Sequence, residues 1–305
     1  MTSSTALLPS VRAAFGSLID YAGLFPPAAL PLAQAQAEYR DARRGPHAWM
    51  LGRFIIPAAT LATLTETFDA PISAIVEPES EALSRVARLR EGGAKVDALE
   101  IPLGETVAPF REHFSFDEML DVLGALETEL VCSGTRDLPA FVEIPRTQPW
   151  QRLLPETLNE IARLALAAKI RCGGVTADAF PSVDELAEFV AAASDARTPF
   201  KATAGLHHPV RRLDRATGFM MHGFLNLLAA AALAPRVPRE TLTAIIAEED
   251  PGAFAFDDTA FAWRDQRVGI AELQTARRSA FVSYGSCSFD DPVEDLTALN
   301  LLPPA

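Results

Sequence analysis

The chain has 305 residues, of which 49% are hydrophobic, and its 27 Lys and Arg against 40 Asp and Glu give a formal net charge of -13. The length allows one or two domains, and a single barrel domain over residues 1–305 can bury one large core. The acidic balance excludes a non-specific nucleic-acid or anionic-membrane surface, because both need basic patches, and it favours a small-molecule partner.

Cysteine usage and the start of the chain favour a cytoplasmic protein. Cys132, Cys172 and Cys287 are widely spaced and form no CxxC pair, so we expect neither a disulfide framework nor a structural zinc site. Residues 1–17 lack the basic region and long apolar run of a secretory signal, and no apolar stretch reaches about 18 residues without interruption. We therefore expect no membrane partner, whereas a homo-oligomer is compatible with the sequence.

Short apolar runs alternate with longer helical patterns along the chain. The runs predict strands at residues 17–27, 49–56, 72–76, 96–101, 139–144, 169–174, 200–205 and 280–285. Helical spacing of apolar residues predicts helices at 30–44, 60–68, 79–91, 155–168 and 183–193. This alternation indicates a parallel sheet, and eight strands predict closure into a (β/α)8 TIM barrel.

The last two predicted strands are far apart, which indicates an insertion at residues 210–270. We expect helices at 218–233 and 239–248, and a β-hairpin at 254–268 where Phe254, Phe256 and Phe261 flank the pair Asp257 and Asp258. The aromatic residues predict that the insertion caps the barrel mouth and shields a ligand. The alternative is a small packing decoration.

Residues 200–209 read FKATAGLHHP and place a lysine, a hydroxyl, a glycine and two imidazoles at the end of a strand. In a TIM barrel this is the end that carries the chemistry. Lys201, Thr203 and Gly205 share one face of the strand, so an inward Lys201 implies an inward Thr203, with Gly205 leaving space above them. The alternative is a buried strand that ends in a solvated lysine.

Several stretches resemble, in order, the deoxyribose-phosphate aldolases. Residues 19–26 read IDYAGLFP, similar to the family line IDHTLLKP; residues 96–102 read VDALEIP, similar to VDVVFP; and residues 169–173 read KIRCG, with the spacing of KTSTG. Residues 200–205 read FKATAG, similar to FKxxGG, and residues 284–288 read YGSCS, similar to the phosphate-binding FGASS. Together these matches span most of the barrel.

The resemblance implies a lyase of the class I aldolase type, in carbohydrate metabolism, that makes or breaks a carbon–carbon bond through a lysine Schiff base without a cofactor. It implies that Lys169 is the nucleophile, that Lys201 tunes it and that Asp97 helps to move protons. It also offers Glu143 and Asp20 as partners of an inward lysine. A free lysine has a pKa of about 10.4, and a neighbouring cation in a partly dry site lowers it.

Two departures from the family leave the roles open. Lys169 directly follows the predicted helix, so it is expected low in the barrel, with Arg171 at the catalytic height. Since arginine cannot form an imine, Lys201 would then be the nucleophile. Asp97 and Glu100 are three residues apart, so only one of them is expected to face inward.

Candidate substrate-binding residues follow from the same stretches. Arg53 and Arg171 offer planar guanidinium groups that suit a carboxylate or a phosphate, or structural salt bridges. Thr203 is a further candidate, because it shares a strand face with Lys201. Backbone N–H groups of the last two barrel loops commonly bind phosphate, which predicts an anion site at Gly205, Gly285, Ser286 and Ser288. The expected substrate is a small anionic carbonyl compound.

Two other functions stay open from the sequence. Carboxylates and imidazoles at strand ends could hold a divalent metal for an isomerase or lyase, with the candidate ligands Glu77, Glu100, Glu143, His207 and His208. The same glutamates could instead form structural ion pairs. The third hypothesis is a non-catalytic ligand-binding barrel.

Overall fold

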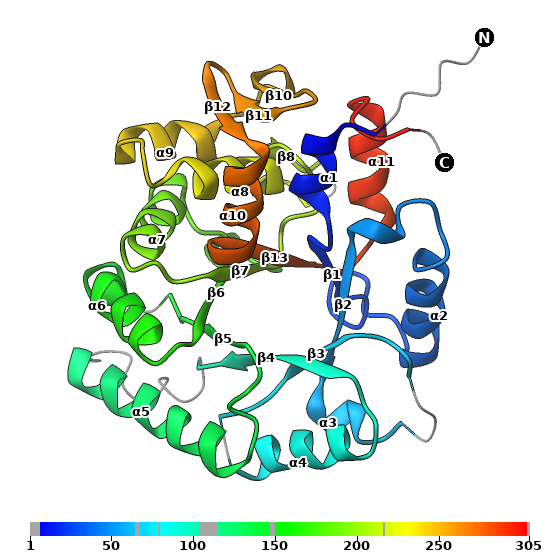
Figure 1. Ribbon diagram of the computed structural model, residues 1–305, viewed down its shortest axis with the longest axis vertical. Coiled ribbons are helices and arrows are strands. Elements are labelled where there is room, and N and C mark those ends of the chain that lie inside the picture. Colours follow the sequence, from blue (N-terminus) through cyan, green and yellow to red (C-terminus); the bar gives the residue numbers. More distant parts are fainter. Residues whose placement is uncertain are drawn as a thin grey trace.

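The computed structural model describes residues 7–64, 68–78, 80–103, 115–146, 150–215 and 217–303. Eight parallel strands close into a barrel in the order β1-β13-β7-β6-β5-β4-β3-β2 (Figure 1). Their bounds are β1 (Ile19–Tyr21), β2 (Leu51–Pro57), β3 (Ile72–Ile75), β4 (Val96–Pro102), β5 (Ala140–Glu143), β6 (Ala167–Arg171), β7 (Phe200–Thr203) and β13 (Phe281–Ser286). The predicted (β/α)8 TIM barrel is therefore confirmed.

Helices surround this ring of strands (Figure 1). They are α1 (Pro9–Phe15), α2 (Leu32–Ala42), α3 (Ala58–Leu61), α4 (Ser80–Glu91), α5 (Phe116–Cys132), α6 (Trp150–Arg163), α7 (Val183–Asp195), α8 (Phe224–Leu233), α10 (Ile270–Ser279) and α11 (Asp290–Ala298). The helix predicted at 60–68 is shortened to α3, and residues 65–67 lie outside the described part. The apolar helix faces and the outer faces of the strands form one large core.

The boundary between α6 and β6 differs from the prediction and decides the height of Lys169. The sequence predicted a helix up to residue 168, but α6 ends at Arg163. Ala165 has a left-handed φ of 49°, and the N–H of Leu166 bonds back to the carbonyl of Ile161 at 2.9 Å, which is a typical helix end. The strand therefore starts at Ala167, and Lys169 is its third residue.

Inward residues of the barrel alternate between an apolar and a charged layer. Ala98, Phe141 and Ala167 pack together with Val282 in a small cluster separate from the main core. Two residues further along β5 and β6, Glu143 pairs in register with Lys169, and Lys169 pairs with Lys201 of β7. Because side chains alternate along a strand, this register brings the three charged groups to one level inside the barrel.

The insertion contains two different parts. Its elements are β8 (Arg212–Leu213), β9 (Met220–Met221), α8, α9 (Arg239–Ala247), β10 (Phe254–Phe256), β11 (Ala260–Trp263) and β12 (Gln266–Gly269). The predicted hairpin is confirmed as β10 and β11, to which β12 adds a third strand. This sheet lies at the periphery beside α10 (Figure 1) and packs on α1, where the Phe256 ring is 5.5 Å from Phe15.

The aromatic residues of the hairpin therefore contact α1, and their expected role in shielding the mouth stays a prediction. The β8–β9 hairpin lies closer to the carboxyl ends of the strands. Phe219 between its strands contacts Phe180 in the loop after β6, with ring centroids 5.2 Å apart. A role of the β8–β9 hairpin in covering the barrel mouth also stays a prediction.

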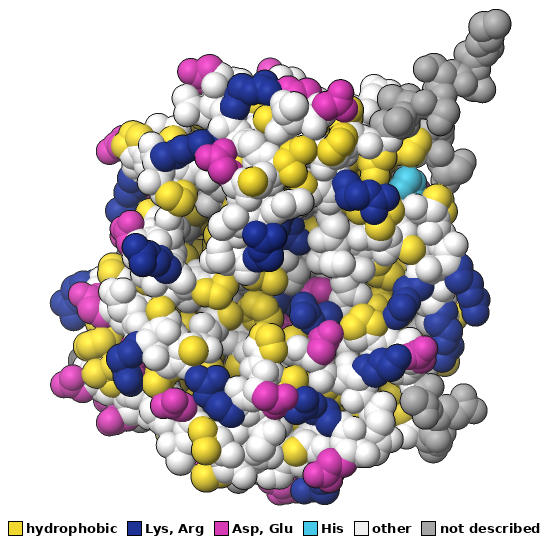
Figure 2. Space-filling view, viewed as in Figure 1, with side chains coloured by type: hydrophobic (Ala, Val, Ile, Leu, Met, Phe, Trp, Pro, Cys, Tyr) yellow, Lys and Arg dark blue, Asp and Glu magenta, His cyan; other side chains and the backbone are white. Residues whose placement is uncertain are grey.

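The outer surface carries charges of both signs. Figure 2 shows Lys and Arg side chains interspersed with Asp and Glu over one face of the molecule. Within the described part of the chain, no helix is both long and apolar enough to cross a membrane.

Candidate active site

A continuous ladder of ion pairs runs through the inside of the barrel. It joins six side chains from five strands in the order Asp20 (β1), Lys201 (β7), Glu100 (β4), Lys169 (β6), Glu143 (β5) and Arg171 (β6). Anions and cations alternate along this ion-pair ladder. The exposed fraction of the side chains rises from 0% at Asp20 and Lys201 to 15% at Glu143 and 52% at Arg171. The Arg171 end therefore faces the solvent at the mouth.

The deep end of the ladder is fully buried and fully hydrogen-bonded. Lys201 Nζ donates to Asp20 Oδ2 at 2.6 Å and to Glu100 Oε1 at 2.5 Å. Ser283 Oγ donates to Asp20 Oδ2, and Ser73 Oγ donates to Glu100 Oε1, both at 2.8 Å. Buried charges are tolerated only when they are paired in this way, so this half of the ladder has one fixed arrangement.

The mouth end is more open. Lys169 Nζ lies 2.7 Å from Glu100 Oε2 and 3.0 Å from Glu143 Oε2. Arg171 is held loosely, with Nη1 3.8 Å from Glu143 Oε1. Glu100 thus bridges the two lysines with its two oxygens, and Lys169 is the lysine nearer to the mouth.

Burial and ion pairing act in opposite directions on the pKa values of these groups. Burial alone would raise the pKa of Glu100, but Lys169 and Lys201 outweigh it and hold that pKa well below its usual range. Burial alone would lower the pKa of Lys169, but Glu100 and Glu143 outweigh it and raise that pKa. At neutral pH the resting site therefore holds Glu100 as a carboxylate and Lys169 as an ammonium.

Two glycines make room for this arrangement. A Cβ atom on Gly52 would lie 2.3 Å from Asp20 Oδ1, the oxygen that accepts the backbone N–H of Arg53 at 2.7 Å. A Cβ atom on Gly285 would lie 3.0 Å from Ile55 and 3.2 Å from Thr203 Oγ1. Gly52 thus lets β2 approach the carboxylate, and Gly285 limits crowding beside the predicted substrate residue Thr203.

The sequence placed two groups incorrectly. Lys169 is not low in the barrel, because β6 starts two residues earlier than expected, and Arg171 lies at the rim. Asp97 does not contact either lysine. It is the second residue of β4, half exposed, and accepts from Arg53 Nε at 2.6 Å. Of the two acidic residues on β4, Glu100 forms ion pairs with both lysines, and Asp97 forms an ion pair with Arg53.

The loops of the predicted anion site are closely packed. Gly205 has a left-handed φ of 67°, and a Cβ there would lie 2.7 Å from the carbonyl oxygen of Cys172, so the loops after β6 and β7 meet closely at this glycine. Ser286 Oγ donates to the carbonyl of Ser288 at 2.6 Å, and Ser288 Oγ accepts from the Asp291 N–H at 3.1 Å. An anion at this turn stays a prediction, and it would compete with these bonds.

The five candidate metal ligands do not form one site. Glu100 and Glu143 are held by the lysines, and Glu77 is exposed beyond the end of β3. His208 Nδ1 lies 2.7 Å from Asp295, and His207 Nδ1 lies 3.8 Å from Asp291. Both imidazoles therefore contact carboxylates of α11. Among the residues that the structure describes, no group of three or more His, Cys, Asp or Glu could hold a metal ion.

No family model and no curated protein matches the sequence. Among solved structures the chain is similar to a protein provisionally assigned as a phosphonomutase from Burkholderia cenocepacia J2315, with 17% identity and a TM-score of 0.34, over 75% of this chain and 92% of that chain.

Two further solved structures are similar at the same level. A Schiff base-forming fructose-1,6-bisphosphate aldolase has 15% identity and a TM-score of 0.41, over 76% of this chain and 92% of that chain. Dihydrodipicolinate synthase from Thermotoga maritima has 14% identity and a TM-score of 0.39, over 87% and 98%. Scores this low carry no argument about activity, and the fold assignment rests on the closed barrel itself.

Proposed function

We propose that this protein is a carbon–carbon lyase of the class I aldolase type, which binds a small anionic carbonyl compound as an imine on Lys169. The observation that carries the proposal is the ion-pair ladder, in which one carboxylate bridges two lysines and one of these lysines lies toward the mouth. Two lysines inside a barrel are costly to bury, and imine chemistry gives them a use.

Lys169 is the better nucleophile of the two. Lys201 lies at the closed end, between Asp20 and Glu100, and its side chain has no exposed area. Lys169 is 5% exposed and next to Glu143, which is itself 15% exposed. In this proposal Lys201 orients Glu100 by donating to its Oε1, which leaves Oε2 to contact Lys169.

Glu143 is the group suited to take the proton that Lys169 must lose. Glu100 is a poor acceptor because two lysines hold its pKa low. The ammonium of Lys169 transfers a proton to Glu143 over 3.0 Å, and the amine then adds to the substrate carbonyl carbon. Glu143 returns the proton to the departing hydroxyl, which leaves as water, and the iminium remains on Lys169.

Bond cleavage follows from the iminium. Glu143, again a carboxylate, takes the proton of the substrate hydroxyl beside the scissile bond. The electron pair of that bond moves into the iminium to give an enamine, which is then protonated and hydrolysed to release the second product and Lys169. Arg171 at the rim suits the anionic group of the substrate, because its guanidinium is half exposed and only loosely paired with Glu143.

Borohydride trapping tests the proposal. The chain has only three lysines, Lys95, Lys169 and Lys201, so an imine reduced in the presence of small aldehydes and keto acids is located directly by peptide mass spectrometry. We expect the adduct on Lys169, its loss in Lys169→Met and its retention in Lys95→Met. Ligand binding without any trapped adduct would favour the non-catalytic barrel, and an adduct on Lys201 alone would reverse the roles of the two lysines.

A further inference from the structure

A second cavity lies outside the barrel, between α2 and α11. Its volume is about 560 Å³, which is within the usual size of small-molecule sites. Its walls come from α2 and the segment after it, from the loop after β1, from the turn after β13 and from α11. The residues used below are Tyr21, Leu30, Glu38, His47, Asp290 and Val293. We call this space the α2–α11 cavity.

The charges around the α2–α11 cavity are of one sign. Glu38 and Asp41 come from α2, and Asp290 comes from α11, so carboxylates stand on both walls. Among its described lining residues none is lysine or arginine. Asp41 has a cation outside the cavity, since Arg44 lies 3.4 Å from it at the surface. Glu38 accepts hydrogen bonds from Tyr21 and Gln34, but within the described part of the chain neither it nor Asp290 has an ion-pair partner, so both can attract a cationic occupant.

Tyr21 holds one of these carboxylates in place. Its hydroxyl donates to Glu38 Oε2 at 2.7 Å. Burial, together with the neighbouring Glu38, raises the pKa of Tyr21, so the phenol stays protonated and donates to Glu38 at neutral pH. The anionic wall thus has a fixed geometry.

His47 supplies an independent sign of a missing partner. It lines the same cavity, only 6% of the residue is exposed, and its buried Nε2 has no hydrogen-bond partner within the described part of the chain. Burial lowers the pKa of His47, so the ring is neutral at neutral pH. A buried polar nitrogen usually finds a partner, and a ligand group in the cavity would provide one.

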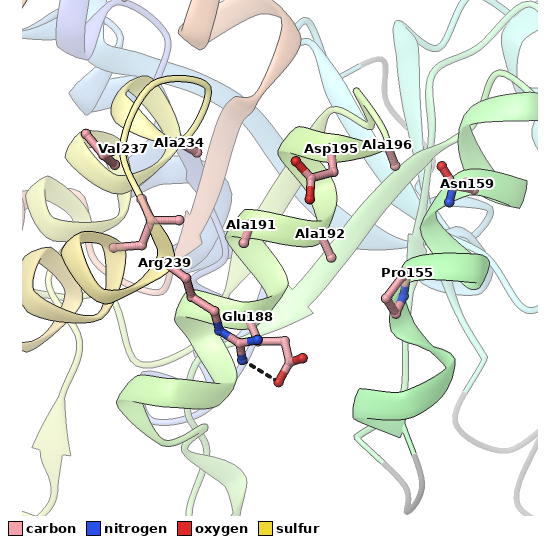
Figure 3. Close-up of a pocket in the computed structure, with 11 residues that line it drawn as sticks. Pro155, Asn159, Glu188, Ala191, Ala192, Asp195, Ala196, Ala234, Val237 and Arg239 are labelled. Atoms are coloured by element: carbon pink, nitrogen blue, oxygen red, sulfur yellow. Dashed lines mark ion pairs between the residues drawn. The ribbon is translucent and has the colours of Figure 1, made fainter.

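The cavity between α6, α7 and the segment before α9 is different. It has a volume of about 320 Å³, and Figure 3 shows Arg239 and Glu188 pointing toward each other at its edge, with an ion pair of 2.8 Å. Its arginine is already satisfied by its glutamate. No described lining residue of the α2–α11 cavity is a lysine or arginine. Its carboxylates therefore still need a positive partner, whereas Glu188 in the other cavity already has Arg239.

From these observations we infer that the α2–α11 cavity binds a small organic amine as its ammonium ion. The ammonium group lies between Glu38 and Asp290 and donates hydrogen bonds to these carboxylates. The apolar body of the amine packs on Leu30 and Val293, and its remaining polar group meets His47. This site is separate from the ion-pair ladder, so it does not depend on the proposed lyase activity.

Calorimetric titration of the full chain with benzylamine tests this inference. Benzylamine is a cation with an apolar ring at neutral pH, and benzyl alcohol is its neutral analogue of nearly the same shape. We expect one saturable benzylamine site per chain and binding of the alcohol that is at least about tenfold weaker.

Two variants and a control locate the site. Glu38→Gln with Asp290→Asn removes charge at nearly constant shape and should weaken benzylamine binding at least about tenfold, while Val293→Trp should fill the cavity and abolish it. Glu240→Gln, an exposed acid on α9, should bind like the wild type. Circular dichroism checks the fold of each variant. Absence of saturable binding, equal binding of the alcohol or unchanged binding in the double variant would each overturn the inference.

Discussion

Lysine is scarce in this chain, and the scarcity marks the site. Of the 27 Lys and Arg, three are lysines. Lys95 forms an ion pair with Asp69 at the surface. Lys169 of β6 and Lys201 of β7 are instead paired in register on neighbouring barrel strands. An arginine stays charged under all working conditions, while a lysine can lose its proton when its surroundings shift its pKa. Counting lysines against arginines is thus a sequence signal that points to the two barrel lysines without any structure.

Replacing Lys201 tests the deep half of the ladder. Lys201→Met should stop turnover, because Lys201 holds Glu100 beside Lys169 in the proposed site. Because the structure buries Lys201 between Asp20 and Glu100, we expect the variant also to lose about 3–5 kcal/mol of unfolding free energy, since Asp20 stays buried without its cation and Glu100 keeps only Lys169.

Urea denaturation of the Lys201→Met variant and the wild type measures this loss. Lys95→Met is the matched control, because its exposed ion pair contributes at most about 1 kcal/mol. A Lys201→Met variant as stable as the Lys95→Met variant would show that the ladder is not a structural unit.

At the scale of elements, the sequence predicted the eight strands but not all of their neighbours. Strands were predictable because apolar runs ended by Pro or Gly recur along the chain. Helix α5 was missed, although Ser115 and Glu118 form a capping box ahead of an apolar periodic run, which is a readable signal. The end of α6 was not readable, because an alanine, Ala165, takes the left-handed conformation that usually indicates glycine. That single boundary moved Lys169 from the bottom of the barrel into the ladder.

The close contact between the β6 and β7 loops gives a prediction about glycine. Gly205→Ala adds a Cβ 2.7 Å from the Cys172 carbonyl at a φ of 67°, so we expect a loss of about 1–3 kcal/mol in unfolding free energy. Gly124→Ala is the matched change inside α5, where an added Cβ would meet no described atom within 4 Å apart from its own helix turn, and it should stabilise by about 0.5–1 kcal/mol. Thermal unfolding of both variants measures the contrast, and equal shifts would contradict the strained-turn explanation.

At the scale of the whole molecule, buried ionisable groups set the pH range of stability. Glu100 has a folded pKa below its unfolded value of about 4.3, so its contribution is complete above that value and is lost as the pH falls toward the folded pKa. Lys169 has a folded pKa above its unfolded value of about 10.4, so its contribution is complete below that value and is lost as the pH rises through the folded pKa. The free energy of unfolding should therefore fall when the pH drops below about 4.3 and also when it rises above about 10.4.

Denaturation of the wild type and of Glu100→Gln at a series of pH values tests the acid side. The difference in unfolding free energy between the two proteins should be largest near pH 7 and should shrink as the pH falls below about 4.3, where the unfolded glutamate is already protonated. The exposed control Glu240→Gln should follow the wild type at each pH. A Glu100→Gln difference that stays constant down to pH 3 would mean that folding does not lower the pKa of Glu100.

The pairing of β1 with β13 has a consequence for how the protein is made. Ile19 lies opposite Tyr284, so 265 residues separate the two strands that close the barrel. At a synthesis rate of about 5–20 residues per second, β1 leaves the ribosome roughly 13–53 seconds before β13 exists to pair with it. During that interval Asp20 has neither Ser283 nor a closed barrel around it. A nascent chain that stops before β13 keeps two open strand edges, which makes such fragments natural substrates for chaperones and proteases.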